Sequence, residues 1–587
     1  MKNKSFVLKR KYSTSGLLSI KKIDEIRGDE TDYLAFAETG LDNEIYQQSK
    51  KVIIIIGDLV VGKNVKRSFE LFYQAVKYNA VHEFGGFFYF IYIDNHRRII
   101  KLWSSLFNIL PIYYCKENNG VTISSRIDLI LRFGDTKNHK IDKQYLLERV
   151  LFNYGLFNRT YLKAIKLVGA NNYVEIGNNH FCEPSCLDIV DLFHSEFNKG
   201  QAVLTALSEK FIDLTEKYLP ESNFAVSFTG GFDGRTLVAV SMNHQKDFFA
   251  YSFGAPESED VSIPMVQSGK IPLEFKPIYL SGSYIENKSY DCGKDLITKT
   301  EGAASFARAH YVYAARILSE MTNYIITGNF GSELFRAMHN PGVMVSRELI
   351  TFFDPRSNDN WKAALTCSKK LNFFRKDSIK NELYGVIEDL EGYKQSFKGL
   401  ETNRFFYTYV LGEIFRKYFG PEIVMQQFFL TNRTPFLDFG FIVELFRSYY
   451  CGVYSDFFTN NPLKRYKGQL LYAYIIKKAC PVLLSMKTGK GYPPEALLTL
   501  RGKLELLTNL ITKKVKAARK GPEDPQAVYR AFLHNKNNWT KIDFFSGIYN
   551  EGYIRERFQR DRPKFDILSN VISSNYYLSA VYPNCIN

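Results

Sequence analysis

Two hydrophobic patterns divide this chain near residue 190. From about residue 50 to 185, short runs of apolar, β-prone residues alternate with turns rich in Asn and Gly. The runs 87–93 and 98–103 look like strands, and the turn 94–96 between them predicts a β-hairpin. This part of the chain is therefore expected to be an antiparallel, β-rich domain.

Beyond residue 200, strand and helix periods alternate. Apolar residues three and four apart predict an amphipathic helix over 201–218. A strand and turn follow at 224–234, then a helix, a strand at 247–253 and a helix around 261–268. Such alternation predicts an α/β fold with a doubly wound parallel sheet, which binds ligands beyond the carboxyl ends of its strands. From about 340 the pattern is mainly helical, with a polar turn at 573–575.

The length of 587 residues is too great for a single hydrophobic core. The changes of pattern predict four parts. Residues 1–50 would form an N-terminal extension, 51–190 the β-rich domain, 200–500 the α/β domain and 501–587 a helical C-terminal extension.

Composition and charge exclude several classes of partner. The net charge of +16 could reflect nucleic acid, an acidic membrane surface or an anionic substrate. The charge is spread along the chain without a zinc-finger, RNP or basic-zipper signature, so no nucleic-acid partner is expected. The apolar run 52–56 is far shorter than the roughly 20 residues of a membrane span. Residues 1–4 do not have the pattern that starts a signal peptide, so none is expected. Eight scattered cysteines fit reduced thiols in a cytoplasm, and the lone near pair Cys182 and Cys186 does not favour a zinc site.

The segment around Asp233 carries the strongest local signal for chemistry. A β-prone run at 225–228 leads into a turn, Thr229-Gly230-Gly231, and a helix can open at Gly234. Backbone N–H groups and the helix dipole make such a turn an anion site. Asp233 would repel a phosphate unless a cation intervened, which indicates Mg²⁺ on a polyphosphate. The spacing fits neither a Walker loop nor GxGxxG, and a plain turn with a helix-capping Asp233 is the alternative.

Seven segments, in the same order, resemble motifs of the asparagine synthetase family, whose members activate a carboxylate by adenylation. Four of them resemble the SGGxDS pyrophosphate loop, the GxGxDELF and R-x-PFLD segments and the K-x-G segment of the catalytic lysine: 229–235, 327–335, 433–438 and 487–489. Three more resemble the GxFAxxxYD, PLYY and ASE elements of the family's glutaminase-like domain: 85–94, 110–114 and 123–126. The resemblance implies an N-terminal glutaminase-like (NTN-hydrolase-like) domain, degenerate here, and a PP-loop ATP pyrophosphatase domain with a helical C-terminal part.

The resemblance also implies ATP and Mg²⁺ as cofactors and assigns roles to single residues. The nucleotide would be bound by Thr229, Gly230, Gly231, Asp233, Gly234, Gly328 and Gly331. Asp233 and Glu333 would hold Mg²⁺, and Lys487 would stabilise the adenylation transition state. Asn329 stands where relatives carry a general base, which Asn cannot be, and Ser332 replaces an acid. A solvated helix-start acid at Glu333 and a solvated loop lysine at Lys487 are the alternatives.

The expected function follows from a missing nucleophile. Relatives that take ammonia from glutamine use an N-terminal cysteine, whereas here Lys2 follows Met1 and the first cysteine is Cys115, inside an apparent strand. We therefore expect the glutaminase reaction to be lost, as in the family's β-lactam synthetase and lasso-peptide cyclase branches. The chain would adenylate a small-molecule or peptide carboxylate for attack by an amine, with a peptide-processing protein as a candidate partner. The alternatives are an ammonia-dependent asparagine synthetase and a non-catalytic nucleotide-binding partner of a biosynthetic complex.

Overall fold

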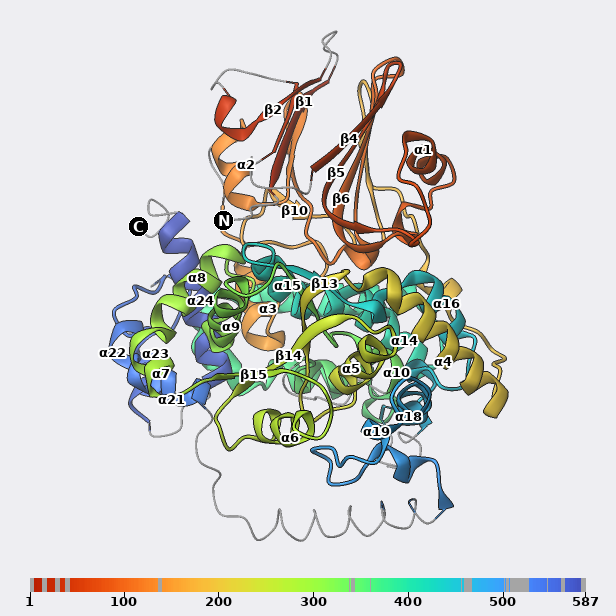
Figure 1. Cartoon of the computed structure of the whole chain (residues 1–587). Helices are drawn as coiled ribbons and strands as arrows, with labels where there is room; N and C mark the ends of the chain where they lie inside the picture. The colour runs from red at the N-terminus through yellow and green to blue at the C-terminus, as the bar shows by residue number, and fades with distance from the viewer. Residues whose placement is uncertain are drawn as a thin grey trace.

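The computed structural model is an α/β protein with two β-sheets at its N-terminal end and a parallel sheet among helices below them (Figure 1). It describes residues 5–581 apart from 13–17, 27–31, 37–42, 136–139, 337, 339–343, 359, 456, 459–466, 501, 503–505, 507–526, 546 and 561–564. Along these residues, none of the helices has the length and apolar character needed to cross a membrane.

Each N-terminal sheet has six strands, and nearly all neighbours are antiparallel. The first runs in the order β10 (Ile165–Leu167), β8 (Tyr113–Glu117), β9 (Gly120–Ser124), β1 (Phe6–Lys11), β3 (Tyr33–Phe36) and β2 (Ser19–Lys22). The second runs in the order β12 (Phe181–Cys182), β11 (Val174–Ile176), β7 (Ile99–Ser104), β6 (Gly85–Asp94), β5 (Lys51–Val60) and β4 (Asn43–Gln48). The predicted hairpin is confirmed as β6 and β7.

Alternation along the strands builds four layers. Leu8 and Ile54 point into a core shared by the two sheets. Their neighbours point outward, Val7 towards helix α2 (Ile127–Phe133) and Ile55 towards helix α1 (Phe69–Lys77). Figure 1 shows these helices on the two outer faces of the sheet pair. The order is helix, sheet, sheet, helix.

The expectation that residues 1–50 form a separate extension is wrong. Strand β1 lies inside the first sheet, paired to β9 on one side and to β3 on the other. Strand β4 forms the edge of the second sheet beside β5. The pairing of Val7 with Ser124 joins residues far apart in the chain, so no local pattern before residue 50 could reveal it.

A five-stranded parallel sheet forms the α/β part, as predicted. Its order is β15 (Phe275–Tyr279), β14 (Asp247–Gly254), β13 (Ser222–Ser227), β16 (Tyr324–Ile326) and β17 (Thr431–Arg433). Phe224 packs in one core with Leu237 of α5 (Asp233–Asn243), and Ala225 faces the other way, towards α8 (Ser289–Lys299) and α9 (His310–Ser319). Helices therefore cover both faces.

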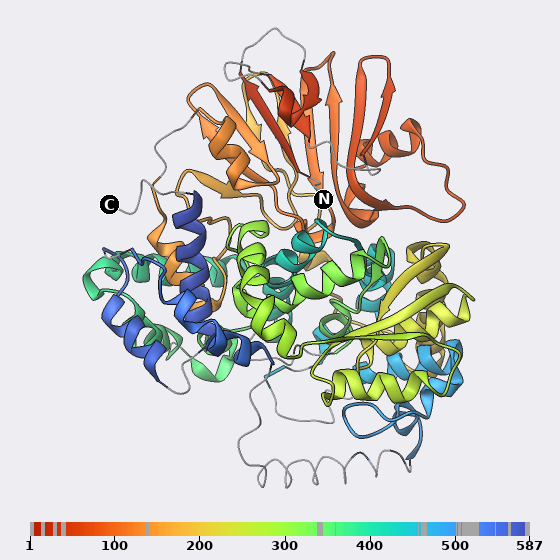
Figure 2. The same ribbon diagram turned by 60° about the vertical axis from the view of Figure 1, so that its left-hand side comes forward.

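Helices dominate after residue 340, as expected, and the described part of 501–587 is helical. The helices there are α21 (Ala527–His534), α22 (Lys536–Trp539), α23 (Glu551–Gln559) and α24 (Phe565–Val581), while 507–526 lie outside the described residues. Helix α24 is no appendage, because it packs on α8 and on α3 (Lys143–Phe152) (Figure 2). The predicted turn at 573–575 is wrong: it lies inside α24, where the Ser573 hydroxyl accepts a hydrogen bond from the Phe306 N–H at 3.0 Å.

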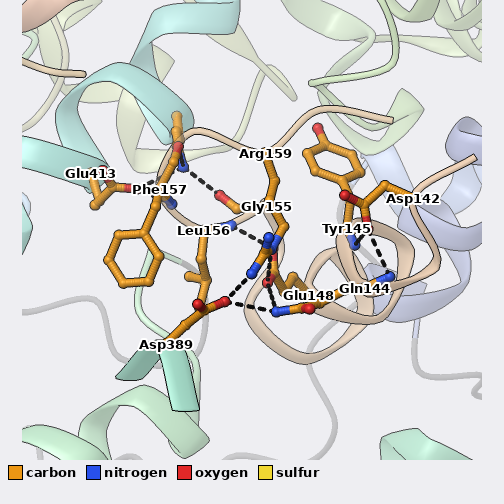
Figure 3. Close-up of polar contacts among 11 residues, drawn as sticks. Asp142, Gln144, Tyr145, Glu148, Gly155, Leu156, Phe157, Arg159, Asp389 and Glu413 are labelled. Carbon is orange, nitrogen blue, oxygen red and sulfur yellow. Dashed lines mark hydrogen bonds and ion pairs between the residues drawn. The ribbon is translucent and has the colours of Figure 1, made fainter. Parts of the chain in front are cut away.

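Charged side chains join the β-rich part to the helices at the segment around α3. Arg159 lies between the carboxylates of Glu148 and Asp389, with 3.0 Å from its Nε to Glu148 Oε1 (Figure 3). Gln144 donates to the same Asp389 at 2.8 Å. Burial raises the pKa of Glu148 to about 7, against the opposing charge of Arg159. Asp389 belongs to α13 (Lys380–Ser396), so this network ties α13 to the α3 segment.

A second link runs from β17 to β5. The Arg433 guanidinium forms a two-pronged ion pair with Asp58, at 2.8 and 2.9 Å. Asp438, which is closer to Arg433 in the sequence, instead accepts from Lys217 and from the Tyr218 hydroxyl. The planar guanidinium of Arg433 and the planar carboxylate of Asp58 fit each other in this two-pronged geometry. Both side chains are mostly shielded from water.

Replacing Asp58 with Asn should destabilise the protein by about 3 kcal/mol, because it leaves the largely buried Arg433 cation without its counter-charge. Urea unfolding of the two proteins measures the loss. Lys63 and Glu216 provide a matched control, since they join the same two parts of the chain at 2.5 Å but are far more exposed. Glu216→Gln should cost under about 1 kcal/mol. Equal costs for the two variants would contradict the expectation.

Candidate functional site

Two turns meet at the carboxyl ends of β13 and β16, the point where the strand order changes direction. Strands β14 and β15 lie on one side of β13, whereas β16 and β17 lie on the other. The turn 228–232 follows β13, and the turn 327–330 follows β16. Crevices at such switch points are where open α/β sheets bind ligands. The two predicted segments are thus neighbours in space.

Glycines allow this contact. A Cβ on Gly328 would lie 2.6 Å from the Asp233 Cβ, and one on Gly331 would lie 2.7 Å from Asp233 Oδ1. A Cβ on Gly234 would meet the Ser227 carbonyl oxygen at 2.3 Å. Protein atoms therefore fill the space beside these three glycines. Gly231 is open by comparison, since its nearest neighbour would be Thr229 Oγ1 at 3.4 Å.

Asp233 is the first residue of α5, and the N-cap position before it is occupied by Phe232. Its Oδ2 accepts from the Ser332 hydroxyl at 2.8 Å, and its Oδ1 accepts from the Tyr472 hydroxyl. The carboxylate thus turns towards α10 (Gly331–Phe335) and α18 (Lys467–Ala479). The helix-capping alternative is wrong, and Asp233 faces the crevice between the two turns.

Glu333 lies on α10 with only 4% of its surface exposed, which is contrary to a solvated helix-start acid. Burial, and then the nearby charge of Asp233, raise the pKa of Glu333 to about 7. Two carboxylates that repel each other in a shielded place offer hard oxygen ligands to a divalent cation. Asp233 and Glu333 thus lie close enough for the charge of Asp233 to raise the pKa of Glu333.

A cation that the sequence reading missed lies beside these acids. Arg336 donates from Nη2 to the Ser332 hydroxyl, which in turn donates to Asp233. Arg336 is 8% exposed, and its Nε has no hydrogen-bond partner among the described residues. The four-residue spacing from Ser332 to Arg336 is the only local signal that could have indicated it. Tyr472 gives none, because it lies 239 residues beyond Asp233.

The segment 487–489 packs against the glycine turn by its backbone. The Gly489 N–H donates to the Gly230 carbonyl at 2.8 Å. The Lys487 carbonyl accepts from Arg235 at 3.0 Å and from Gln267 at 2.6 Å. The Lys487 side chain is exposed, and its ammonium makes no ion pair or hydrogen bond with the residues that the structure describes. The lysine is thus anchored near the turn, with its charged end free to reach a ligand.

Asn329 has an acidic neighbour that the sequence did not reveal. Its Nδ2 lies 3.5 Å from Oε1 of Glu422, which belongs to α15 (Gly420–Gln426). Arg308 donates to the other oxygen of Glu422 at 2.7 Å, yet burial keeps the pKa of this carboxyl raised. Arg308 also lines a cavity of about 310 Å³ that Asp566 and Asn570 of α24 line too. The ion pair of Arg308 with Glu422 therefore links this cavity to Asn329 in the turn after β16.

Gly331→Ala should destabilise the protein by about 1–3 kcal/mol, because the new methyl group would displace Asp233 and the Phe436 ring at 3.0 Å. Gly392→Ala is the control. Gly392 is exposed within α13, and no atom lies within 4 Å of its added Cβ, so this change should be neutral or stabilising by up to about 1 kcal/mol. Thermal unfolding followed by circular dichroism compares the two. A neutral Gly331→Ala would contradict the close packing.

Comparison with known proteins adds no assignment to this geometry. No protein-family model matches the chain, and no curated protein is significantly similar to it. What the site can do is therefore inferred from the side chains that meet at the ends of β13 and β16, and from the order of the motifs along the sequence.

Proposed function

We propose that this chain is an ATP-dependent amide-bond-forming ligase of the asparagine synthetase type. It would adenylate a carboxylate, release pyrophosphate, and pass the acyl group to an amine with loss of AMP. One observation carries the proposal: three of the seven ordered motifs, which resemble the family's ATP-binding segments, meet around Asp233 at the switch point of the parallel sheet. Ligands of such sheets bind at this place.

The residues present fit Mg²⁺ and a polyphosphate. Asp233 and Glu333 offer carboxylate oxygens, which magnesium prefers, and the exposed Lys487 ammonium can reach a phosphate. Bound Mg²⁺ would neutralise phosphate charge during adenylation. The chain's own part is positional: Thr229 Oγ1 accepts from the Gly231 N–H at 3.3 Å and so shapes the turn that would lie beside the phosphates.

The carboxylate substrate would occupy the cavity beside Arg308. Its volume of about 310 Å³ suits a small molecule or the end of a peptide. Arg308 and Lys417 line it, each paired with a carboxylate, Arg308 with Glu422 and Lys417 with Glu413. Glu422, next to Asn329, would accept the proton of the attacking amine, because Asn329 itself cannot. Burial holds the pKa of Glu422 above its usual range, which suits a proton acceptor near neutral pH.

The β-rich part would be a glutaminase-like domain without its nucleophile. Its four layers are consistent with that proposal, and Cys115 is buried in β8, where it behaves as a small hydrophobic residue. An ammonia-dependent asparagine synthetase would use the same site with ammonia as the amine. A non-catalytic nucleotide-binding protein is the second candidate, and it is favoured by the loss of an acid at Ser332 and of a base at Asn329.

Asp233→Asn should lower ATP–pyrophosphate exchange by about a hundredfold or more, because a lost metal ligand removes several kcal/mol of charge stabilisation. The exchange is measured with a panel of amino-acid, peptide and hydroxy-acid carboxylates. Asp247→Asn, at the exposed start of β14, should retain full activity. Exchange that survives in Asp233→Asn would rule out this site, and ATP binding without exchange by any carboxylate would favour the non-catalytic candidate.

Mg²⁺-dependent nucleotide binding should strengthen as pH rises through about 7, because Glu333 must lose its proton to hold the ion and its pKa is raised to about 7. Fluorescence titration with a labelled ATP analogue at fixed Mg²⁺ follows the change. Glu333→Gln should abolish this step. Arg336→Met should move its midpoint upward, since the guanidinium charge lowers the pKa of Glu333. A midpoint that stays the same in both variants would assign the step to another group.

A further inference from the structure

Three side chains of the kinds that bind transition metals gather on the hairpin of β11 and β12, within the β-rich part. Glu175 and Cys182 are direct partners across the two strands. His180 belongs to the turn that joins them. One ligand atom from each of the three residues lies within 4.8 Å of the others.

The turn is built so that the imidazole can lie over it. The Gly177 N–H donates to the His180 carbonyl at 3.0 Å, which closes the turn. A Cβ on residue 177 would lie 2.0 Å from the His180 ring, so only glycine leaves room for this orientation. The ring nitrogen Nε2 then lies 3.8 Å from Glu175 Oε1. The thiol of Cys182 lies against the Glu175 carbonyl at 3.9 Å.

We propose that Glu175, His180 and Cys182 bind a zinc ion. A thiolate, an imidazole and a carboxylate form a donor set that suits zinc and does not suit magnesium or calcium. Zinc bonds of about 2.0–2.3 Å place neighbouring ligand atoms roughly 3–4 Å apart, close to the 3.8 Å between His180 and Glu175. His180 and Cys182 are exposed, so their side chains can close the remaining distance, and water can complete the tetrahedron.

A lysine on the neighbouring strand tunes the site. Lys101 of β7 lies opposite Glu175, and its ammonium is 2.9 Å from Oε2 of that carboxylate. The other oxygen, Oε1, is the one that faces His180. Lys101 therefore shares the carboxylate with the metal and weakens its hold by charge repulsion. This arrangement makes a prediction that an ordinary surface triad would not: removal of the lysine should tighten the binding of zinc.

The site would fix the end of the second sheet. Strand β12 has only the two residues Phe181 and Cys182, and it forms the edge beside β11. A metal held from both strands and from the turn would hold this short pairing closed. The Asp233 and Glu333 pair lies in another part of the fold and offers only oxygen ligands, so the zinc site does not rest on the proposed ligase function.

Cobalt titration of the tag-free, reduced full-length protein tests the proposal. We expect one equivalent of Co²⁺ to give the near-ultraviolet absorption of a cobalt–thiolate bond, which zinc then displaces. Cys182→Ser should abolish this absorption, and His180→Ala should weaken zinc binding at least about tenfold in competition with a chromophoric chelator. Lys101→Met should bind zinc more tightly than the wild-type protein.

Cys186→Ser is the matched control. The Cys186 thiol donates to the Asn171 carbonyl at 3.0 Å, and burial raises its pKa to about 11, so this variant should bind cobalt as the wild type does. A cobalt–thiolate absorption that survives in Cys182→Ser, or zinc affinity unchanged in His180→Ala, would overturn the proposal. His180 is exposed, so its loss leaves the fold intact and the result is readable even if Cys182→Ser unfolds.

Discussion

Close approach of two backbones at Gly328 and Gly331 is the constraint on which the site depends. Asp233 can lie between the turns of β13 and β16 only because neither glycine carries a side chain there. Once the carboxylate is in this crevice, it meets the hydroxyls of Ser332 and Tyr472 and raises the pKa of the buried Glu333. The close approach of the two backbones at these glycines therefore leads to the raised pKa of Glu333. Glycines in such turns usually leave room for a ligand. Here Gly234, Gly328 and Gly331 instead leave room for other atoms of the protein.

Helix α5 carries this arrangement further through Arg235. The helix begins at Asp233, and two residues later the Arg235 guanidinium, fully buried, donates to the carbonyls of Leu483, Met486 and Lys487. Burial lowers the pKa of Arg235 to about 10, and the three carbonyls offset part of the cost of burying the charge. The same short helix thus presents the acid at its start and fixes the loop that bears Lys487.

Local signals made part of this structure predictable from sequence. A glycine turn after an apolar run correctly indicated the end of β13, and alternating periods indicated the parallel sheet, since both depend on residues close in the chain. Contacts across the chain could not be read in this way. Glu422 contacts Asn329 although 93 residues separate them in the sequence. Arg433 pairs with Asp58 and not with the nearby Asp438, because tertiary packing determines which acid lies beside it. Serines inside α24 looked like a turn, because their buried partners are invisible in the sequence.

The charges in the crevice explain how its residues differ from the GxGxDELF motif that segment 327–335 resembles. The motif of the asparagine synthetase family, which segment 327–335 resembles, has an acid at the position of Ser332. The Ser332 hydroxyl accepts a hydrogen bond from the cationic Arg336. Compared with the motif that it resembles, the position carries no negative charge and has a positive neighbour. A polyphosphate placed there, as proposed, would need less metal charge to offset its own, because the guanidinium supplies a fixed positive charge in a shielded place. The Nε of Arg336 has no hydrogen-bond partner among the described residues, and Arg336 is only 8% exposed. One donor of its guanidinium is therefore available. Under the proposed function, Ser332 and Arg336 would be a coupled replacement of the acid rather than the decay of a metal site.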